Sequence, residues 1–166
     1  MLKASYSYYF FFSFFVLFSS CKNNSENTSN SISVNEPSFK KEADLWFINK
    51  EEDTLTQLEI EIADSDYEYQ TGLMYRKEMK ANRGMLFIYN EEQVRPNFYM
   101  KNTYIPLDLI YINSAFKIVD INRNAQPMNE SPIPSEAASQ YVLEVNAGMA
   151  DQWKISLGDR AVFKRE

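Results

Sequence analysis

The sequence predicts a mostly β (α+β) fold, a compact single-domain β-barrel or sandwich with one main helix and a short second helix. Several short segments alternate apolar and polar side chains, which is typical of strands that bury one face. One segment, "GMLFIYN" at residues 84–90, is continuously apolar and is expected to be a fully buried strand. The clearest helical signal lies at about residues 65–76, where a helix start pattern precedes helical spacing.

The first two predicted strands lie at residues 43–49 ("ADLWFIN") and 56–63 ("TQLEIEIA"). In the second of them, Leu58, Ile60 and Ile62 share one face while glutamates occupy the other, as strand alternation requires. A short polar segment, "EEDT", separates the two strands. We therefore expect two half-buried strands joined by a polar link.

The main helix is predicted at about residues 65–76. Ser65 and Glu68 have the spacing of a capping box, in which each side chain bonds to the other residue's backbone N–H. Tyr69 and Leu73 then fall four residues apart, on one helical face. A short second helix is expected at about residues 149–155 ("MADQWKI").

Further strands are predicted at residues 116–122 ("FKIVDIN"), 141–146 ("YVLEVN") and 158–163 ("GDRAVF"), the last of them after a turn. The segment "FYMKNTYIPLDLIYIN", residues 98–113, is predicted to form two strands around a polar turn. An Asn-Thr pair in its middle suits a turn, because both side chains bond to nearby backbone. The proline that follows then directs the chain into the second strand.

The start of the chain has the pattern of a bacterial lipoprotein export signal. Lys3 precedes an apolar run that is shorter than the roughly 20 residues of a bilayer span. The run ends at two serines and Cys21, the single cysteine, which is similar to a lipobox and predicts lipidation there. An ordinary secretory signal with a cysteine nearby is the alternative. We expect a signal peptide at 1–20, a flexible lipoprotein tether at 21–38 and a single β-rich domain at 39–166.

The composition excludes several classes of chemistry. The chain has no histidine, which excludes a Ser-His-Asp triad and His-ligated zinc. A lipid on the single cysteine would leave no thiol for a disulfide, a nucleophile or a metal. The net charge of −6 and the lack of a basic stripe argue against nucleic acid as a partner. We expect no metal site and no cofactor.

The ordered motifs of the domain resemble a known family. They are "GLMYR" at 72–76, "GMLFIY" at 84–89, "FYMKNTYIPLDLIYI" at 98–112, "SPIPS" at 131–135, "YVLEVNAG" at 141–148 and "LGDRAVF" at 157–163. In this series the chain is similar to the bacterial and archaeal domain of unknown function 192. The resemblance implies a compact, mostly β fold with a helix that carries the GLM-x-R motif, and it implies no reaction. Tyr99 stands where the family usually has Trp, and Phe116 falls near a turn glycine of the family, so we expect a different turn geometry there.

The central segment also carries the candidate site. Lys101 and Asp108 are expected to lie close together across the turn. Arg76 follows an apolar helical face, and Glu144 interrupts an apolar strand. Charges of this kind need partners of opposite sign when they are buried. Two interpretations stay open, a structural network of ion pairs and a ligand-binding cleft. The residues assigned to the hypothetical cleft are Arg76, Tyr99, Lys101, Asn102, Thr103, Asp108 and Glu144.

The function expected from these features is binding. We expect a lipid-anchored protein of the bacterial cell envelope, periplasmic or surface-facing, that contacts the membrane through the lipid on Cys21. Its cleft would take a small polar or anionic ligand or an envelope partner, with Arg76 and Lys101 holding an anionic group. One alternative is a histidine-free enzyme that uses Asp108 or Glu144 as general base. The other is a purely structural envelope protein, and no catalytic residue is assigned.

Overall fold

The computed structural model describes residues 36–166, so the predicted signal peptide, the lipidation site Cys21 and most of the predicted tether lie outside the described residues. Within this range the chain forms a mostly β domain, which confirms the predicted fold class. The strands are β1 (Ala43–Ile48), β2 (Thr54–Ala63), β3 (Arg83–Gln93), β4 (Leu107–Ile112), β5 (Ile118–Ala125), β6 (Ser139–Asn146) and β7 (Arg160–Arg165). The helices are α1 (Asp66–Thr71) and α2 (Met149–Gln152). No helix of residues 36–166 is long and apolar enough to cross a membrane.

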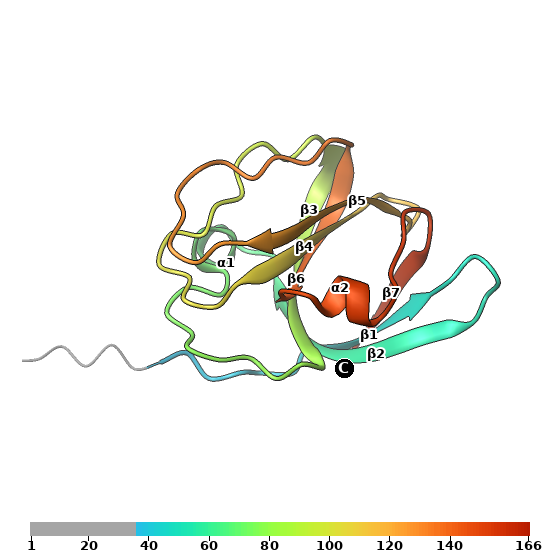
Figure 1. Cartoon of the computed structure of the whole chain (residues 1–166), viewed down its shortest axis with the longest axis horizontal. Coiled ribbons are helices and arrows are strands. Elements are labelled where there is room, and N and C mark those ends of the chain that lie inside the picture. The colour runs from blue at the N-terminus through green and yellow to red at the C-terminus, as the bar shows by residue number, and fades with distance from the viewer. Residues whose placement is uncertain (1–35) are drawn as a thin grey trace, which may run out of the picture. The chain divides into compact units, whose positions relative to one another are not determined.

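The strands form one seven-stranded sheet in the order β5-β4-β6-β3-β2-β1-β7 (Figure 1). β2 and β3 are parallel, and the other neighbouring pairs are antiparallel. The two edge strands meet at their starts, through a bridge between Lys117 and Arg160 and a hydrogen bond from the Ile118 N–H to the Asp159 carbonyl of 2.8 Å. The sheet is therefore barrel-like without closing along the full length of its edges.

Each face of the sheet carries its own hydrophobic core. The α2-side core contains Ala150 of α2 and Leu143 of β6. The α1-side core contains Leu73, which follows α1, and Val142 of β6. Adjacent residues of β6 thus belong to different cores, because side chains alternate between the faces of a strand. This alternation decides on which side each functional side chain lies.

α1 begins as predicted but is shorter than the predicted range of about 65–76. The capping box is present: the Glu68 N–H lies 3.4 Å from Ser65 Oγ, and the Ser65 N–H lies 3.1 Å from the Glu68 carboxylate. The helix ends at Thr71 because the next residue, Gly72, adopts a φ of 44°, outside the helical region.

Residues with positive φ explain two further differences from expectation. α2 ends at Gln152, earlier than the predicted range of about 149–155, and Lys154 then adopts a φ of 60°. Phe116 was expected to change its turn, yet it adopts the left-handed conformation itself, with a φ of 58°. Its ring stacks on Tyr141, with centroids 5.3 Å apart, and meets the Phe163 ring edge-on at 6.2 Å. Aromatic packing therefore stabilises a backbone conformation that Phe alone disfavours.

The prediction of two strands at residues 98–113 is wrong for the first half. β4 forms the second half, directly after the proline, as predicted. The first half makes a single isolated bridge, between Phe98 and Ile133, and the Met100 N–H then bonds to the Asn129 carbonyl at 2.7 Å. Because this backbone finds its partners in another loop instead of a neighbouring strand, the segment forms a loop over the α1-side core.

Candidate functional site

A pocket of about 390 Å³ opens on the α1 side of the sheet. Its walls come from α1 and the turn after it, from β3, from the loop between β3 and β4, and from one residue of β6. This volume falls in the range of small-molecule sites, roughly 300–1,000 Å³. The lining includes Tyr69, Gly72, Phe87, Tyr89, Arg95, Phe98, Tyr99, Thr103 and Glu144.

Glu144 is the acidic side chain of this lining. In the sheet register it lies opposite Met85 of β3 and Leu109 of β4, so apolar residues flank it on both sides. Its residual exposure is 6%, and no group within residues 36–166 donates a hydrogen bond to its carboxyl. Burial raises the pKa of this carboxyl from its ordinary value of 4.5 to about 8. At neutral pH the side chain is therefore largely protonated.

The turn after α1 brings backbone close to this carboxyl. Gly72 has a φ of 44°, and a Cβ at this position would lie 2.9 Å from Phe87 Cζ and 3.7 Å from Glu144 Oε2. A side chain here would strain the backbone and displace the Phe87 ring. Glycine therefore allows the helix to end beside the pocket.

Aromatic rings form the apolar wall of the pocket. Tyr69 and Tyr89 stack with centroids 4.8 Å apart and ring planes at 17°. Phe87 and Phe98 meet edge to face, with centroids 5.3 Å apart. The Tyr69 hydroxyl donates to the Ile88 carbonyl, which fixes its ring in the wall. Such a surface suits a flat or cyclic apolar group.

Arg95, the basic side chain of the lining, already has partners. Its guanidinium lies 3.8 Å from the centroid of the Tyr89 ring. Nε and Nη2 donate to the Ser139 carbonyl at 3.1 and 2.9 Å, and Nη2 also donates to the Glu91 carbonyl. These contacts hold the loop at the pocket and direct the arginine away from an ion pair with Glu144.

The structure places three of the seven predicted site residues in the pocket lining: Tyr99, Thr103 and Glu144. Tyr99 is 40% exposed, and Thr103 is buried. Asn102 forms the adjacent turn with a φ of 54°, a conformation that asparagine tolerates. The Lys101 side chain is exposed and does not line the pocket.

Asp108 faces the opposite side of the sheet from Glu144. In the register of β4 and β6, Asp108 pairs with Val145, while Leu109 pairs with Glu144. Directly paired residues point to the same face and successive residues to opposite faces. Asp108 therefore lies on the α2 side and Glu144 on the α1 side.

The carboxylate of Asp108 has backbone partners. It accepts hydrogen bonds from the Asn124 N–H at 2.9 Å and from the Ala150 N–H at 3.1 Å, and its residual exposure is 1%. The Lys101–Asp108 ion pair of the structural interpretation does not form, because the lysine lies in an exposed turn and the aspartate is enclosed on the sheet's other face.

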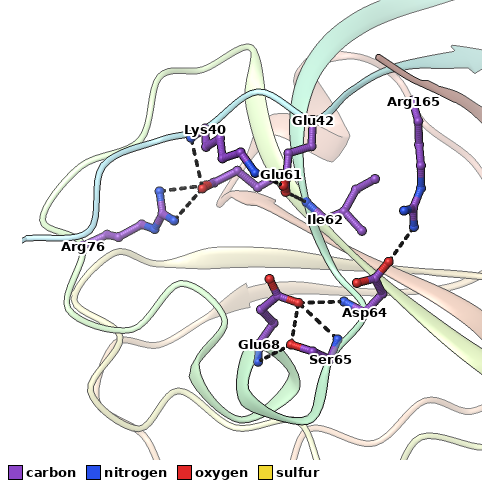
Figure 2. Close-up of polar contacts among 9 residues, drawn as sticks. All are labelled: Lys40, Glu42, Glu61, Ile62, Asp64, Ser65, Glu68, Arg76 and Arg165. Carbon is purple, nitrogen blue, oxygen red and sulfur yellow. Dashed lines mark hydrogen bonds and ion pairs between the residues drawn. The ribbon is translucent and has the colours of Figure 1, made fainter.

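Arg76 pairs with a carboxylate that sequence reasoning assigned only to a strand face (Figure 2). Its Nη1 lies 2.8 Å from Glu61 Oε2, and its Nη2 donates to Glu61 Oε1 at 2.9 Å. Both residues are 6% exposed, and Glu61 also accepts from the Lys40 N–H at 3.2 Å. The expectation that a buried arginine needs an opposite charge is confirmed, but the predicted cluster of Arg76, Lys101, Asp108 and Glu144 does not form.

The pocket residues that sequence reasoning does not identify include Tyr69, Tyr89 and Arg95. Strand alternation places Tyr89 on the same face as Phe87, but β3 is apolar on both faces, so the pattern gives no sign of a pocket. Tyr69 is correctly placed on a helical face, where packing is the simpler interpretation. Arg95 lies in a loop without periodic pattern.

Residues 36–166 thus define a class of protein: a small β-rich domain with a buried, unpaired carboxyl in an aromatic pocket. The chain belongs to the DUF192 family, described as an uncharacterised ACR, whose family model matches residues 47–163. This match confirms the resemblance drawn from the ordered motifs. The comparison with curated proteins gives no match.

Two similar proteins have solved structures. A candidate transcription regulator from Sinorhizobium meliloti 1021 is 35% identical, with 76% of this chain and 98% of that chain covered and a TM-score of 0.71. A protein of unknown function from Novosphingobium aromaticivorans DSM 12444 is 30% identical, with 72% of this chain and 83% of that chain covered and a TM-score of 0.65. The fold described above is therefore shared with proteins of these two bacteria.

Proposed function

We propose that this domain binds a small ligand in the pocket around Glu144. The observation that carries the proposal is the state of the Glu144 carboxyl, which lines an open pocket, is 6% exposed and has no donor within residues 36–166. Buried polar groups are costly without a partner, and nearly all of those in native proteins have one. A ligand that donates a hydrogen bond to Glu144 would supply that partner.

The walls of the pocket support a ligand with a flat or cyclic apolar body. Tyr69, Phe87 and Phe98 border the pocket with aromatic surface, and Glu144 offers an acceptor at the β6 side. The anionic ligand expected from Arg76 and Lys101 has less support, because neither cation lines this pocket.

The proposal includes a location at the cell envelope. The apolar run that ends at Cys21 supports lipid anchoring, so the domain would meet its ligand or partner outside the cytoplasm. Transcription regulation, the role in the name of the Sinorhizobium relative, has less support from this chain, because a net charge of −6 does not favour binding to a polyanion.

The same carboxyl supports a second candidate, an acid–base enzyme. A group with a pKa of about 8 can donate and accept a proton near neutral pH, as catalytic carboxyls do. Of the two general bases considered from the sequence, Glu144 lines the pocket and Asp108 does not. A bound compound that is recovered unchanged after long incubation with the protein supports binding, and a converted one supports an enzyme.

The test of binding is protein-observed NMR of the full-length chain in detergent, titrated with small aromatic fragments. Wild type is compared with Glu144→Gln and with Glu130→Gln, a matched control at an exposed position outside the pocket lining. We expect at least one fragment to shift the resonances of Gly72 and Thr103 in wild type and control, and to shift them less in Glu144→Gln. Fragments that leave these resonances unmoved in wild type would overturn the proposal.

A further inference from the structure

One charged side chain of the pocket is available to a ligand. The lining contains two side chains that carry formal charge, Glu144 and Arg95. The Arg95 guanidinium is held by the Ser139 carbonyl and covers the Tyr89 ring. The Glu144 carboxyl has no partner within residues 36–166. Among residues 36–166, an ionised Glu144 therefore has no positive charge to pair with, and a cationic ligand would supply one.

The other titratable groups around Glu144 are phenols. Tyr69 and Tyr89 line the same pocket from α1 and β3, and Tyr111 lies in β4, a direct neighbour of β6 in the sheet. Burial raises the pKa of Tyr89 and of Tyr111, and the Glu144 carboxyl adds to both shifts. All these phenols stay neutral through the physiological range, so none of them compensates the charge of Glu144.

The aromatic wall of the pocket also favours a positively charged ligand. Ring faces carry negative partial charge and attract cations that lie within about 6 Å of the ring centre, more strongly where water is excluded. The stacked pair Tyr69 and Tyr89 and the edge-to-face pair Phe87 and Phe98 border the pocket that Glu144 lines. A carboxylate beside aromatic faces is complementary to an organic cation with an apolar body.

We propose, building on the proposed function, that the ligand is a small organic amine whose ammonium group pairs with the ionised Glu144 carboxylate while its apolar body lies against the aromatic wall. The charge balance is simple. The amine keeps its own proton, and the Glu144 carboxylic acid releases one proton to solvent as the ion pair forms.

This mechanism makes affinity dependent on pH. Because the carboxyl pKa is raised to about 8 in the free protein, most molecules at pH 6 must lose a proton before they pair with the amine, whereas about half have already lost it at pH 8. The apparent affinity for an amine that stays protonated should therefore rise about fiftyfold from pH 6 to pH 8.

The experiment titrates the full-length chain in detergent with phenethylamine, 2-phenylethanol and phenylacetate at pH 6 and pH 8, followed by the resonances of Gly72 and Thr103. The three probes share a phenyl ring and differ in charge: positive, neutral and negative. Glu144→Gln is titrated in parallel, because its amide keeps the size of the side chain and cannot ionise. We expect phenethylamine to bind wild type best, to gain affinity with pH, and to lose that gain in Glu144→Gln.

The outcomes separate this inference from the proposed function. If 2-phenylethanol or phenylacetate binds in the pocket as well as phenethylamine does at pH 8, the pocket binds small molecules and the amine assignment is overturned. An amine affinity that stays flat between pH 6 and pH 8, or that Glu144→Gln leaves intact, also overturns the assignment. If none of the three probes moves the pocket resonances, both the assignment and the binding proposal are contradicted.

Discussion

Asp108 and Glu144 lie on paired strands one register step apart, yet they occupy opposite environments. Asp108 faces the α2 side, where the Asn124 and Ala150 N–H groups donate to its carboxylate. Glu144 faces the α1 side, where it borders a pocket and has no donor among the described residues. The first carboxylate ties the edge of the sheet to a helix, and the second is directed towards a space that a ligand can fill.

This contrast teaches how to distinguish a structural from a functional carboxyl in one domain. Both side chains interrupt apolar strands and both are almost fully buried. Their sequence context therefore looks alike, and burial alone does not separate them. The hydrogen-bond partners do separate them, because a buried group with satisfied partners has a complete structural role and an unsatisfied one does not.

The largest effect on stability is expected for Asp108→Ala, which removes the carboxylate whose hydrogen bonds are satisfied. The substitution leaves the buried Ala150 N–H and the partly buried Asn124 N–H without their acceptor. Each lost partner costs about 1–3 kcal/mol, so the free energy of unfolding should fall by about 2–6 kcal/mol. Urea denaturation followed by circular dichroism measures this change.

Asp108→Asn is the matched control for this prediction. Asparagine keeps one carbonyl oxygen in the same position and can still accept from one of the two N–H groups. Its free energy of unfolding should therefore lie between those of wild type and Asp108→Ala. Equal denaturation midpoints for wild type and Asp108→Ala would show that the two contacts do not stabilise the fold.

The second largest effect on stability is expected for Glu144→Gln, at the carboxyl that has no hydrogen-bond donor, and it is expected to depend on pH. The carboxyl pKa is 4.5 in its ordinary state and about 8 in the folded domain, so the folded state binds the proton more tightly. This contribution to stability is complete below pH 4.5 and is lost as pH rises towards 8. Relative to the variant, wild type should lose about 3 kcal/mol of unfolding free energy between pH 4.5 and pH 7.

The measurement is the difference between the two proteins' unfolding free energies at each pH. Other carboxylates titrate equally in both proteins, so their contributions cancel in that difference. A difference that stays constant from pH 4.5 to pH 7 would mean that Glu144 is ionised in the folded state, and it would remove the physical basis for proton release on ligand binding.

Much of the fold follows from local patterns in the sequence. Leu58, Ile60 and Ile62 alternate as β2 requires, and the capping box at Ser65 and Glu68 marks the start of α1. The ends of α1 and α2 are less predictable, because both depend on single residues with non-helical backbone angles. Phe116 shows the same limit, since rings distant in sequence stabilise its left-handed turn.

The candidate site follows from the sequence only in part. An acidic residue in the apolar strand β6 gives a clear signal, and Tyr99 and Thr103 belong to the same motif-rich segment. Which carboxylate meets which cation depends on the pairing of distant strands. The alternation within β4 does not by itself reveal that Asp108 points away from Glu144, and nothing local reveals that Arg76 pairs with Glu61.

The smallest effect is expected for Lys101→Ala. This variant tests whether the turn that carries Lys101 contributes to stability, as Asp108 does, or to ligand binding, as Glu144 does. Lys101 is exposed, and no ion pair to it is formed within residues 36–166, so its loss should change the free energy of unfolding by at most about 0.5 kcal/mol. Phenethylamine affinity should also stay unchanged, because the side chain lies outside the pocket lining. Thermal unfolding and the same NMR titration measure both quantities. A loss of affinity without a loss of stability would show that the Lys101 side chain contacts the ligand on binding, and the binding site would then extend beyond the pocket lining to this side chain.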